Sequence, residues 1–442
     1  MRPAARIRAA VEAMEMVLTA MQAGGAGAEA VLARYFRARR YAGAKDRRAI
    51  QDLVYCGLRR LAELDARLAF CDLATTSRNR VLLAAIMQAG EPAADWFGGP
   101  YGLPSPSSGE MAGLLRAARL PADVLPEPAR LSVPDWAWAG LARRFGDALK
   151  EEAAGWDREA SVDLRVIESH LSRNRLLISL AGMGLEAEPA PWAPTAVRLD
   201  RRVGRGRLRG ILDRLAIAQD EGSQIAAHLA DVRPGMTVVE LGAGGGGKTA
   251  ALADALRGRG RVVAVDVDRR RLERARRRLE SLGLAGLVEW VMLPAAPDEA
   301  RERLAPWLGL ADRVLVDVPC TGSGTWRRHP DRKWRWKGED LAGLRQTQQT
   351  MLAHALALAA PAAGARVVYV TCSLLPEENE DVVLRILDRH RDWELCDHRG
   401  VLRSLGWTRI PETAALLPSC LQLAPARHHT DGLFVAVLAR KL

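Results

Sequence analysis

The stretch that decides the fold is TVVELGAGGGGKTAALADALRGRGRVVAVDV, residues 237–267. Two short β-branched runs, 237–242 and 261–267, flank a glycine-rich turn and a helical pattern. Strands too apolar to have a wet face, alternating with helices, are typical of a parallel sheet covered by helices on both sides. The stretch therefore predicts an α/β domain.

The same alternation continues to the end of the chain. Further strand-like runs are LVEWVML (287–293), RVLVDVP (313–319) and ARVVYVTCS (365–373), with helical patterns between them. We therefore predict one mostly parallel sheet within residues 216–442. Because such folds bind ligands at the carboxyl ends of their strands, the chemistry is sought in the residues that follow each strand.

The first half of the chain has a different pattern. Residues 1–130 show only helical signals, with apolar side chains three and four positions apart in the stretch 45–70. Residues 131–215 mix helical stretches with one strand-like run, VDLRVIES (162–169). We predict an all-helical domain over 1–130 and a connecting α+β subdomain over 131–215.

Composition limits the class of protein. The chain has 442 residues, 48% of them hydrophobic, and a net charge of 64 − 53 = +11. This excludes a disordered chain and favours a polyanionic partner. Six cysteines without a C-x-x-C pair argue against a disulfide framework and a zinc site, so we expect a cytoplasmic protein without metal. No apolar run is long enough for a membrane span, and we expect a monomer without a membrane partner.

The glycine-rich loop after the first strand has two interpretations. It runs Gly242, Ala243, Gly244, Gly245, Gly246, Gly247, Lys248. The loop and Thr249 satisfy G-x-x-x-x-G-K-T, and Asp317 could then hold Mg²⁺ in an ATPase. Alternatively, Asp266, about 20 residues past the loop, could hold the hydroxyls of a ribose, as in nucleoside-binding folds. Cys320 and Cys372, which follow two other strands, are unexplained by ATP hydrolysis.

Six motifs occur in the order known from one family. They are QDEGSQ (219–224), GGKT (246–249), VVAVDVDRRRL (262–272), VDVPCTGSG (316–324) with RRHPDRKW after it, YVTCSLLPEENE (369–380) and DGLFVAVL (431–438). On these motifs, residues 219–442 resemble the RsmB/Sun family of RNA (cytosine-5) methyltransferases. Residues 1–130 resemble the NusB-like helical domain that RsmB-type members carry.

The resemblance implies a Rossmann-like class I methyltransferase domain with a seven-stranded sheet. It implies S-adenosylmethionine as methyl donor and RNA, in particular small-subunit ribosomal RNA, as substrate. Cys372 is then the nucleophile that adds to carbon 6 of cytosine, Cys320 assists release, and Asp317 contacts the base. The donor would lie over Gly242 to Lys248, with Asp266 on its ribose, Lys248 near its carboxylate and Asp317 near its methionine part.

This sequence departs from the family pattern in two places. Gly242, Gly244 and Gly245 replace Cys, Ala and Pro of the usual loop. The third strand lacks the usual Gly-Asp end, and Asp298 is the remaining candidate for the acid that contacts the adenine. An inactive RNA-binding relative is therefore a third hypothesis beside the methyltransferase and the ATPase.

Two basic stretches are candidates for RNA contact. WRRHPDRKWRWK (326–337) interleaves basic residues and tryptophans, which favours base stacking with phosphate contacts by Arg327, Arg328, Lys333 and Trp334. RLDRRVGRGRLRG (198–210) is either a solvated loop or a phosphate-tracking surface. The helical stretch RRRLERARRRLE (269–280) is expected to turn its arginines to solvent.

Overall fold

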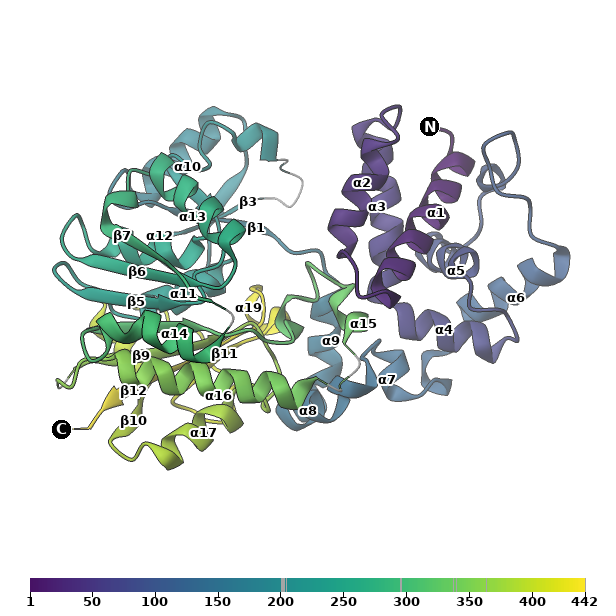
Figure 1. Cartoon of the computed structure of the whole chain (residues 1–442). Helices are drawn as coiled ribbons and strands as arrows, with labels where there is room; N and C mark the ends of the chain where they lie inside the picture. Colours follow the sequence, from purple (N-terminus) through teal and green to yellow (C-terminus); the bar gives the residue numbers. More distant parts are fainter. Residues whose placement is uncertain are drawn as a thin grey trace. The chain divides into compact units, whose positions relative to one another are not determined.

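The structure is a computed structural model that describes the chain except residues 200–202, 204, 295, 337, 339, 363 and 442 and the side chains of Arg205, Pro297 and Asp298. The chain forms two compact units (Figure 1). Unit 1 comprises Met1–Arg158 and Thr325–Glu339, and unit 2 comprises Glu159–Gly324 and Asp340–Leu442. The boundary expected after residue 130 thus differs from the boundary between the compact units, because the next two helices belong to unit 1.

Unit 1 is helical, as predicted for its N-terminal part. Its α-helices are α1 (Pro3–Gln22), α2 (Ala28–Arg37), α3 (Ala44–Arg59), α4 (Leu61–Phe70), α5 (Ser77–Ala89), α6 (Ser108–Arg119), α7 (Glu127–Arg130), α8 (Asp135–Phe145), α9 (Leu149–Asp157) and α15 (Arg332–Arg335). Helix α5 starts at the N-cap Thr76, whose side chain accepts a hydrogen bond from the Asn79 N–H. The buried face of α1, including Met14 and Val17, packs with Leu32 of α2 and Ile50 of α3.

Unit 2 begins with a small antiparallel sheet. Its strands are β1 (Val162–Val166), β2 (Ala187–Pro189), β3 (Ala196–Leu199) and β4 (Ala216–Ala218), in the order β2-β3-β1-β4. Helix α10 (Arg173–Gly182) packs its buried Leu176 and Leu180 with Leu164 and Val197 of this sheet. From residue 159 onward this region thus contains both strands and a helix.

The main sheet of unit 2 has the order β10-β12-β9-β8-β5-β6-β7, and β11 pairs with β12 as an eighth strand. The parallel strands are β5 (Thr237–Leu241), β6 (Arg261–Asp266), β7 (Val288–Met292), β8 (Arg313–Asp317) and β9 (Arg366–Thr371). Strands β10 (Trp393–Cys396), β11 (Leu421–Leu423) and β12 (Leu433–Arg440) pair antiparallel. Because β5 lies between β6 and β8, the direction of chain winding reverses there, which places a ligand crevice at its carboxyl end.

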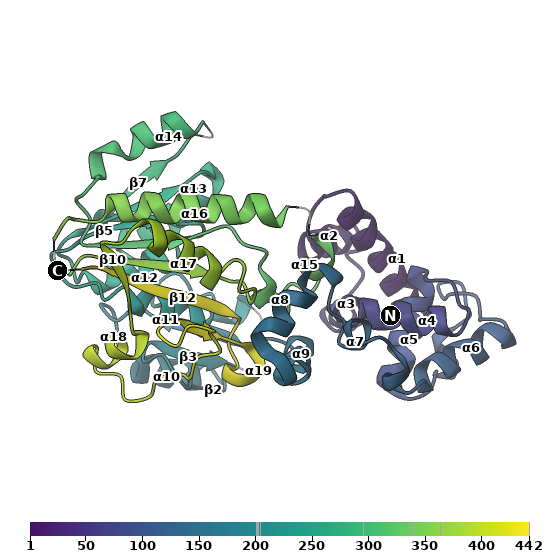
Figure 2. The same ribbon diagram turned by 90° about the horizontal axis from the view of Figure 1, so that it is seen from below.

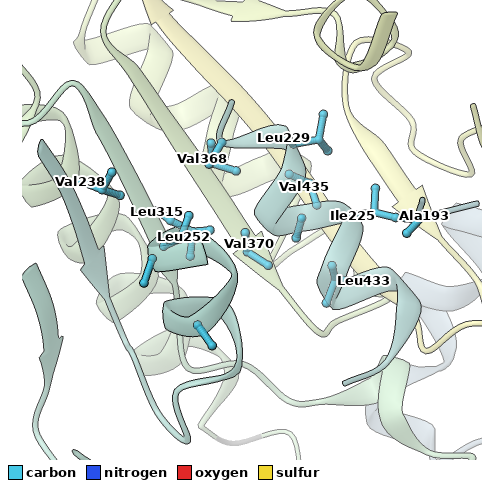
Figure 3. Close-up of a cluster of buried hydrophobic side chains, with 14 of the residues drawn as sticks. Ala193, Ile225, Leu229, Val238, Leu252, Leu315, Val368, Val370, Leu433 and Val435 are labelled. Atoms are coloured by element: carbon cyan, nitrogen blue, oxygen red, sulfur yellow. The ribbon is translucent and has the colours of Figure 1, made fainter. Parts of the chain in front are cut away.

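Helices cover both faces of this sheet (Figure 2). One face packs against α11 (Glu221–Leu229), α12 (Gly247–Ala255), α13 (Arg269–Ser281) and α18 (His398–Ser404). In Figure 3, Ile225 and Leu229 of α11 and Leu252 of α12 lie with strand residues such as Val238 and Leu315. The other face packs against α14 (Pro297–Leu304), α16 (Leu341–Leu358) and α17 (Glu380–Arg389). The inner strands β5, β6, β8 and β9 are buried on both sides, which explains their continuous apolar sequence.

The remaining short helix of unit 2, α19 (Pro425–His428), precedes the last strand. Among the described helices, none combines the length and apolar character that a membrane crossing requires. In the described part of the chain, no group of three or more His, Cys, Asp or Glu side chains could hold a metal ion.

Candidate active site

The glycine-rich loop lies directly against the end of β8. Gly242 has φ +82°, and a Cβ atom there would lie 2.2 Å from the Asp317 carbonyl oxygen. Gly246 has φ +77°, and its Cβ would lie 2.8 Å from the Cβ of Ala275 in α13. Only glycine fits both positions, since each combines a left-handed backbone with a close neighbour. The loop is therefore built for close approach at the crevice.

Asp266 holds the loop from the neighbouring strand. Its Oδ2 accepts a hydrogen bond of 2.7 Å from the Gly244 N–H, and its Oδ1 accepts one of 2.8 Å from the Asp268 N–H. The side chain stands at the carboxyl end of β6, beside the loop, as predicted. Its contact with a ribose stays a prediction.

Lys248 and Asp317 form an ion pair across the crevice. The Lys248 Nζ lies 2.7 Å from the Asp317 Oδ2. Burial lowers the pKa of Lys248, but the Asp317 charge and hydrogen bond outweigh burial and raise the pKa above its usual value. Lys248 is therefore charged and pairs with Asp317. The structure joins these two residues to each other, whereas we expected Lys248 to face the donor carboxylate.

The two cysteines singled out in the sequence meet in space. The Sγ atoms of Cys320 and Cys372 lie 3.2 Å apart, after β8 and β9 respectively. The hydrogen bond with Cys372, burial, and the nearby charges of Glu378 and Asp317 raise the pKa of the Cys320 thiol well above its usual value. Cys320 is therefore a thiol at neutral pH that can donate a hydrogen bond to a Cys372 thiolate.

Glu378 is a site residue that the sequence analysis missed. Its Oε1 accepts hydrogen bonds from the Thr321 N–H at 2.9 Å and from the Gln348 side chain at 3.0 Å. Its Oε2 accepts from the hydroxyls of Thr321, at 2.6 Å, and Ser373. Thr321 follows Cys320 and Ser373 follows Cys372, so one buried carboxyl group ties both cysteine loops together.

The charge state of Glu378 reflects two opposing effects. Burial raises the pKa of Glu378, and the hydrogen bonds that it accepts from Ser373, Thr321 and Gln348 lower it. Burial has the larger effect, so the pKa lies above its usual value. In the sequence, Glu378 is one of three acids in PEENE (376–380), and nothing there tells that Glu378 joins the cysteine loops while the equally buried Glu380 accepts a hydrogen bond from the Leu416 N–H instead.

The ends of β6 and β7 carry exposed apolar side chains. Val267 is 69% exposed and Met292 is 47% exposed, and Asp266 pairs with Met292 in the sheet. The chain continues through Leu293 and Pro294, so no acid follows β7 directly. The side chain of Asp298 lies outside the described residues. An apolar surface of this kind suits a flat aromatic ring.

The described residues of the predicted stacking segment 326–337 do not form an exposed surface throughout. Within unit 1, Lys333 is fully buried, its Nζ donates to the Arg59 carbonyl oxygen at 3.2 Å, and it lies 5.5 Å from the ring centre of Trp326. The Trp334 indole N–H donates to the Leu58 carbonyl oxygen at 2.7 Å.

Two arginines expected to contact phosphate, Arg327 and Arg328, are also poorly placed for it. Arg327 is buried, and its carbonyl oxygen accepts from Arg59 at 3.2 Å. Arg328 is half-buried. The expected RNA contacts of Lys333 and Trp334 are therefore corrected, because helix α3 already satisfies their polar groups and the tryptophans bury the lysine stem.

The basic stretch 198–210 is only partly described, since residues 200–202 and 204 and the Arg205 side chain lie outside the described part. Arg198 is engaged internally, with its Nε 2.8 Å from Asp163 and its Nη2 3.1 Å from Glu221. Arg209 is exposed. The first arginine of the stretch therefore has a structural role.

The crevice has the features that a nucleoside-type donor requires. It combines a glycine-rich loop, an acid at the end of β6, an apolar surface beyond that acid and a charged pair at the end of β8. The residues present therefore fit S-adenosylmethionine, whose parts are a charged amino acid, a ribose and an adenine.

Comparison with known proteins identifies close counterparts. The family model described as 16S rRNA methyltransferase RsmB/F matches residues 227–439, and a ferredoxin-like domain of RsmF/B-like methyltransferases matches residues 133–204. The probable ribosomal RNA small subunit methyltransferase B of Synechocystis sp. is 31% identical over 312 residues, 70% of this chain and 67% of that protein. Ribosomal RNA small subunit methyltransferase B of Proteus mirabilis is 28% identical over 415 residues, 90% of this chain and 91% of that protein.

Solved structures show the same fold. The crystal structure of PH0851 has a TM-score of 0.74 at 22% identity and covers 99% of each chain. A methyltransferase homologue from Pyrococcus horikoshii has a TM-score of 0.58 at 27% identity and covers 71% of this chain and 97% of its own.

Proposed function

The chain belongs to the RsmB/F family of methyltransferases and uses S-adenosylmethionine, and on this basis we propose that it methylates carbon 5 of a cytosine in small-subunit ribosomal RNA. The observation that carries the proposal is the pair of thiols 3.2 Å apart at the ends of β8 and β9. Carbon 5 of cytosine is a poor nucleophile. Its methylation therefore needs a thiolate that adds to the ring and activates carbon 5, and a base that removes the carbon 5 proton after methyl transfer.

Cys372 supplies the activating thiolate. Its sulfur bonds to carbon 6 of the ring, and the electron pair of the 5,6 double bond becomes available at carbon 5. Bound S-adenosylmethionine supplies the methyl group. Asp317, which is paired with Lys248, accepts hydrogen bonds from the cytosine amino group and from ring nitrogen 3 once that nitrogen has taken a proton from solvent, which favours the adduct.

Cys320 completes the reaction. Once the Cys372 sulfur is bonded to carbon 6 it carries no charge, so the contact that most strongly raises the pKa of Cys320 is lost. The Cys320 thiol can then release its own proton to solvent, and the resulting thiolate can take the proton from carbon 5. The 5,6 double bond re-forms as the bond between carbon 6 and Cys372 breaks, and Cys372 leaves as a thiolate.

The donor is proposed to lie over the loop from Gly242 to Lys248, with Asp266 on its ribose. Val267 and Met292 would then contact the adenine in place of the usual third-strand acid, since both are exposed at adjacent strand ends. For unit 1, which resembles NusB-like domains, we propose a role in docking RNA. Its exposed basic side chains on and near α2 support this role: Arg34, Arg37, Arg40 and Lys45.

The test is transfer of a tritium-labelled methyl group to a small-subunit ribosomal RNA transcript, followed by digestion to nucleosides. We expect the label in 5-methylcytidine, and label in any other nucleoside would contradict the proposed position. Calorimetry with the donor and with MgATP separates the rivals. Binding of MgATP without binding of the donor would favour the ATPase hypothesis. Absence of binding for both ligands would favour the inactive relative.

A further inference from the structure

Helix α13 carries a stripe of arginines that the proposed chemistry does not use. Its buried face is formed by Leu272, Ala275 and Leu279. Three of its arginines have acidic partners: Arg269 with Glu273 at 3.0 Å, Arg276 with Glu280 at 3.0 Å and Arg278 with Asp213 at 3.1 Å. The other four are exposed and have no acidic partner among the described residues: Arg270, Arg271, Arg274 and Arg277. We call these four the arginine stripe.

Local energetics disfavour this arrangement in the isolated protein. Arg270 and Arg274 are four positions apart, and Arg274 and Arg277 are three apart, so like charges face each other on one side of the helix. Arg270 and Arg271 also lie in the first turn, where the helix dipole disfavours positive charge, and no acid occupies that turn. A helix that needed only solubility would not require this pattern, because mixed charges serve that purpose better.

Helix α13, which carries the stripe, lies beside the donor loop, and of the four stripe residues Arg271 is the one near it, with its Cζ 3.9 Å from the position of a Cβ at Gly244. The Arg278 Nη1 donates a hydrogen bond of 2.6 Å to the Gly245 carbonyl oxygen, and Ala275 packs against Gly246. The ion pair between Arg278 and Asp213 also joins α13 to the turn that carries exposed Arg214. Two basic segments far apart in sequence therefore lie side by side near the crevice.

We propose that the arginine stripe binds phosphate groups of the RNA strand that flanks the target cytosine. This inference rests on the proposed RNA substrate and assigns it a binding surface. A polyanion relieves both the like-charge repulsion and the unfavourable dipole interaction. A protein partner fits less well, because the exposed positions of α13 are charged or polar and offer none of the apolar side chains that form the core of protein interfaces.

The test uses the full chain with three stripe residues replaced: Arg270→Ala, Arg274→Ala and Arg277→Ala. The matched control removes three exposed arginines elsewhere in unit 2: Arg385→Ala and Arg389→Ala on α17 and Arg403→Ala on α18. Both triple variants lower the net charge equally, and alanine preserves helix propensity. Affinity for a small-subunit ribosomal RNA transcript is measured at several salt concentrations, with donor binding as the check of folding.

We expect the slope of log affinity against log salt to become shallower by roughly 2 to 3 for the stripe variant, since each lost phosphate contact contributes about 0.7 to 0.9. Donor binding should not change, and the control should keep the slope of the unmodified protein. Equal slopes for the stripe variant and the control would contradict the proposal that the arginine stripe binds RNA. An effect seen only with intact ribosomal subunits, and not with the transcript, would also overturn it in favour of a protein partner. Failure of the unmodified chain to bind or methylate RNA would instead overturn the proposed function.

Discussion

The Cys320 and Cys372 thiols lie 3.2 Å apart although 52 positions separate them in sequence. Their strands explain the contact, because β8 and β9 pair in parallel with Asp317 opposite Val370. Both cysteines follow the carboxyl ends of these strands, and the buried Glu378 accepts hydrogen bonds from both loops. The two sulfurs are thus held close enough for one to influence the charge of the other.

The two thiols should have different roles. Cys372→Ala should abolish methylation and any covalent attachment to RNA, since no sulfur remains to add to carbon 6. In Cys320→Ala, the Cys372 sulfur should still add to carbon 6 and the methyl group should still be transferred. The methylated RNA should then stay bonded to the protein. A denaturing gel would show a slow RNA-linked band for Cys320→Ala, none for Cys372→Ala and none for the double variant.

Cys396→Ala is the matched control for loss of a thiol outside the crevice, and it should behave as the unmodified protein. A stable adduct in Cys372→Ala would mean that the roles are reversed. Absence of an adduct in every variant, with donor binding intact, would support an inactive relative.

Glu378 should act as a positioning residue. In Glu378→Gln an amide nitrogen replaces one of the two accepting oxygens, which disturbs the hydroxyls of Thr321 and Ser373. We expect kcat to fall by roughly tenfold or more, as about 1.4 kcal/mol of lost hydrogen bonding would produce, with little change in donor affinity. Glu377→Gln changes the same charge one residue away and should leave kcat unaltered. Equal kcat for the Glu378 variant and its control would refute the positioning role.

Asp266 should contribute to donor affinity. Asp266→Ala removes a charged acceptor, so the binding free energy of S-adenosylmethionine should weaken by about 1.5 to 3 kcal/mol. Asp268→Ala is the comparison variant, because Asp268 is two residues away and caps α13 through the Arg271 N–H. Calorimetry measures both affinities. Unchanged donor affinity in Asp266→Ala would place the ribose elsewhere.

Lys333 should matter for the stability of unit 1 and not for RNA binding. Burial lowers its pKa to about 8, compared with 10.5 for a free lysine. Between these values the unfolded chain binds the proton and the folded chain does not, so the free energy of unfolding should rise as pH increases from about 8 to about 10.5. Lys333→Met should remove this rise, which urea unfolding at several pH values would measure.

The same variant tests whether Lys333 contacts RNA. RNA affinity and its salt dependence should be unchanged in Lys333→Met, because the ammonium group is buried. A shallower salt slope in Lys333→Met would restore Lys333 as a phosphate contact.

The sequence by itself determined where the strands lie along the chain, where the glycine-rich loop lies and which acids follow the strands. Apolar β-branched runs that alternate with helices admit few arrangements, and residues at strand ends converge on one edge of a parallel sheet. For this reason Asp266, Asp317, Cys320 and Cys372 could be named from local pattern alone. The helical nature of residues 1–130 followed from periodicity in the same way.

Only the tertiary structure decided the roles that depend on contacts between distant segments. Glu378 lies on the inner side of its turn because Thr321 and Gln348, far away in sequence, donate to it. Lys333 and Trp334 have the composition of an RNA-binding loop, yet helix α3 accepts their hydrogen bonds, and Lys333 is buried beside tryptophan rings. Composition reports which groups a segment can offer. Whether water, RNA or another part of the chain satisfies those groups depends on the free energy of packing, which is set by neighbours that no local pattern contains.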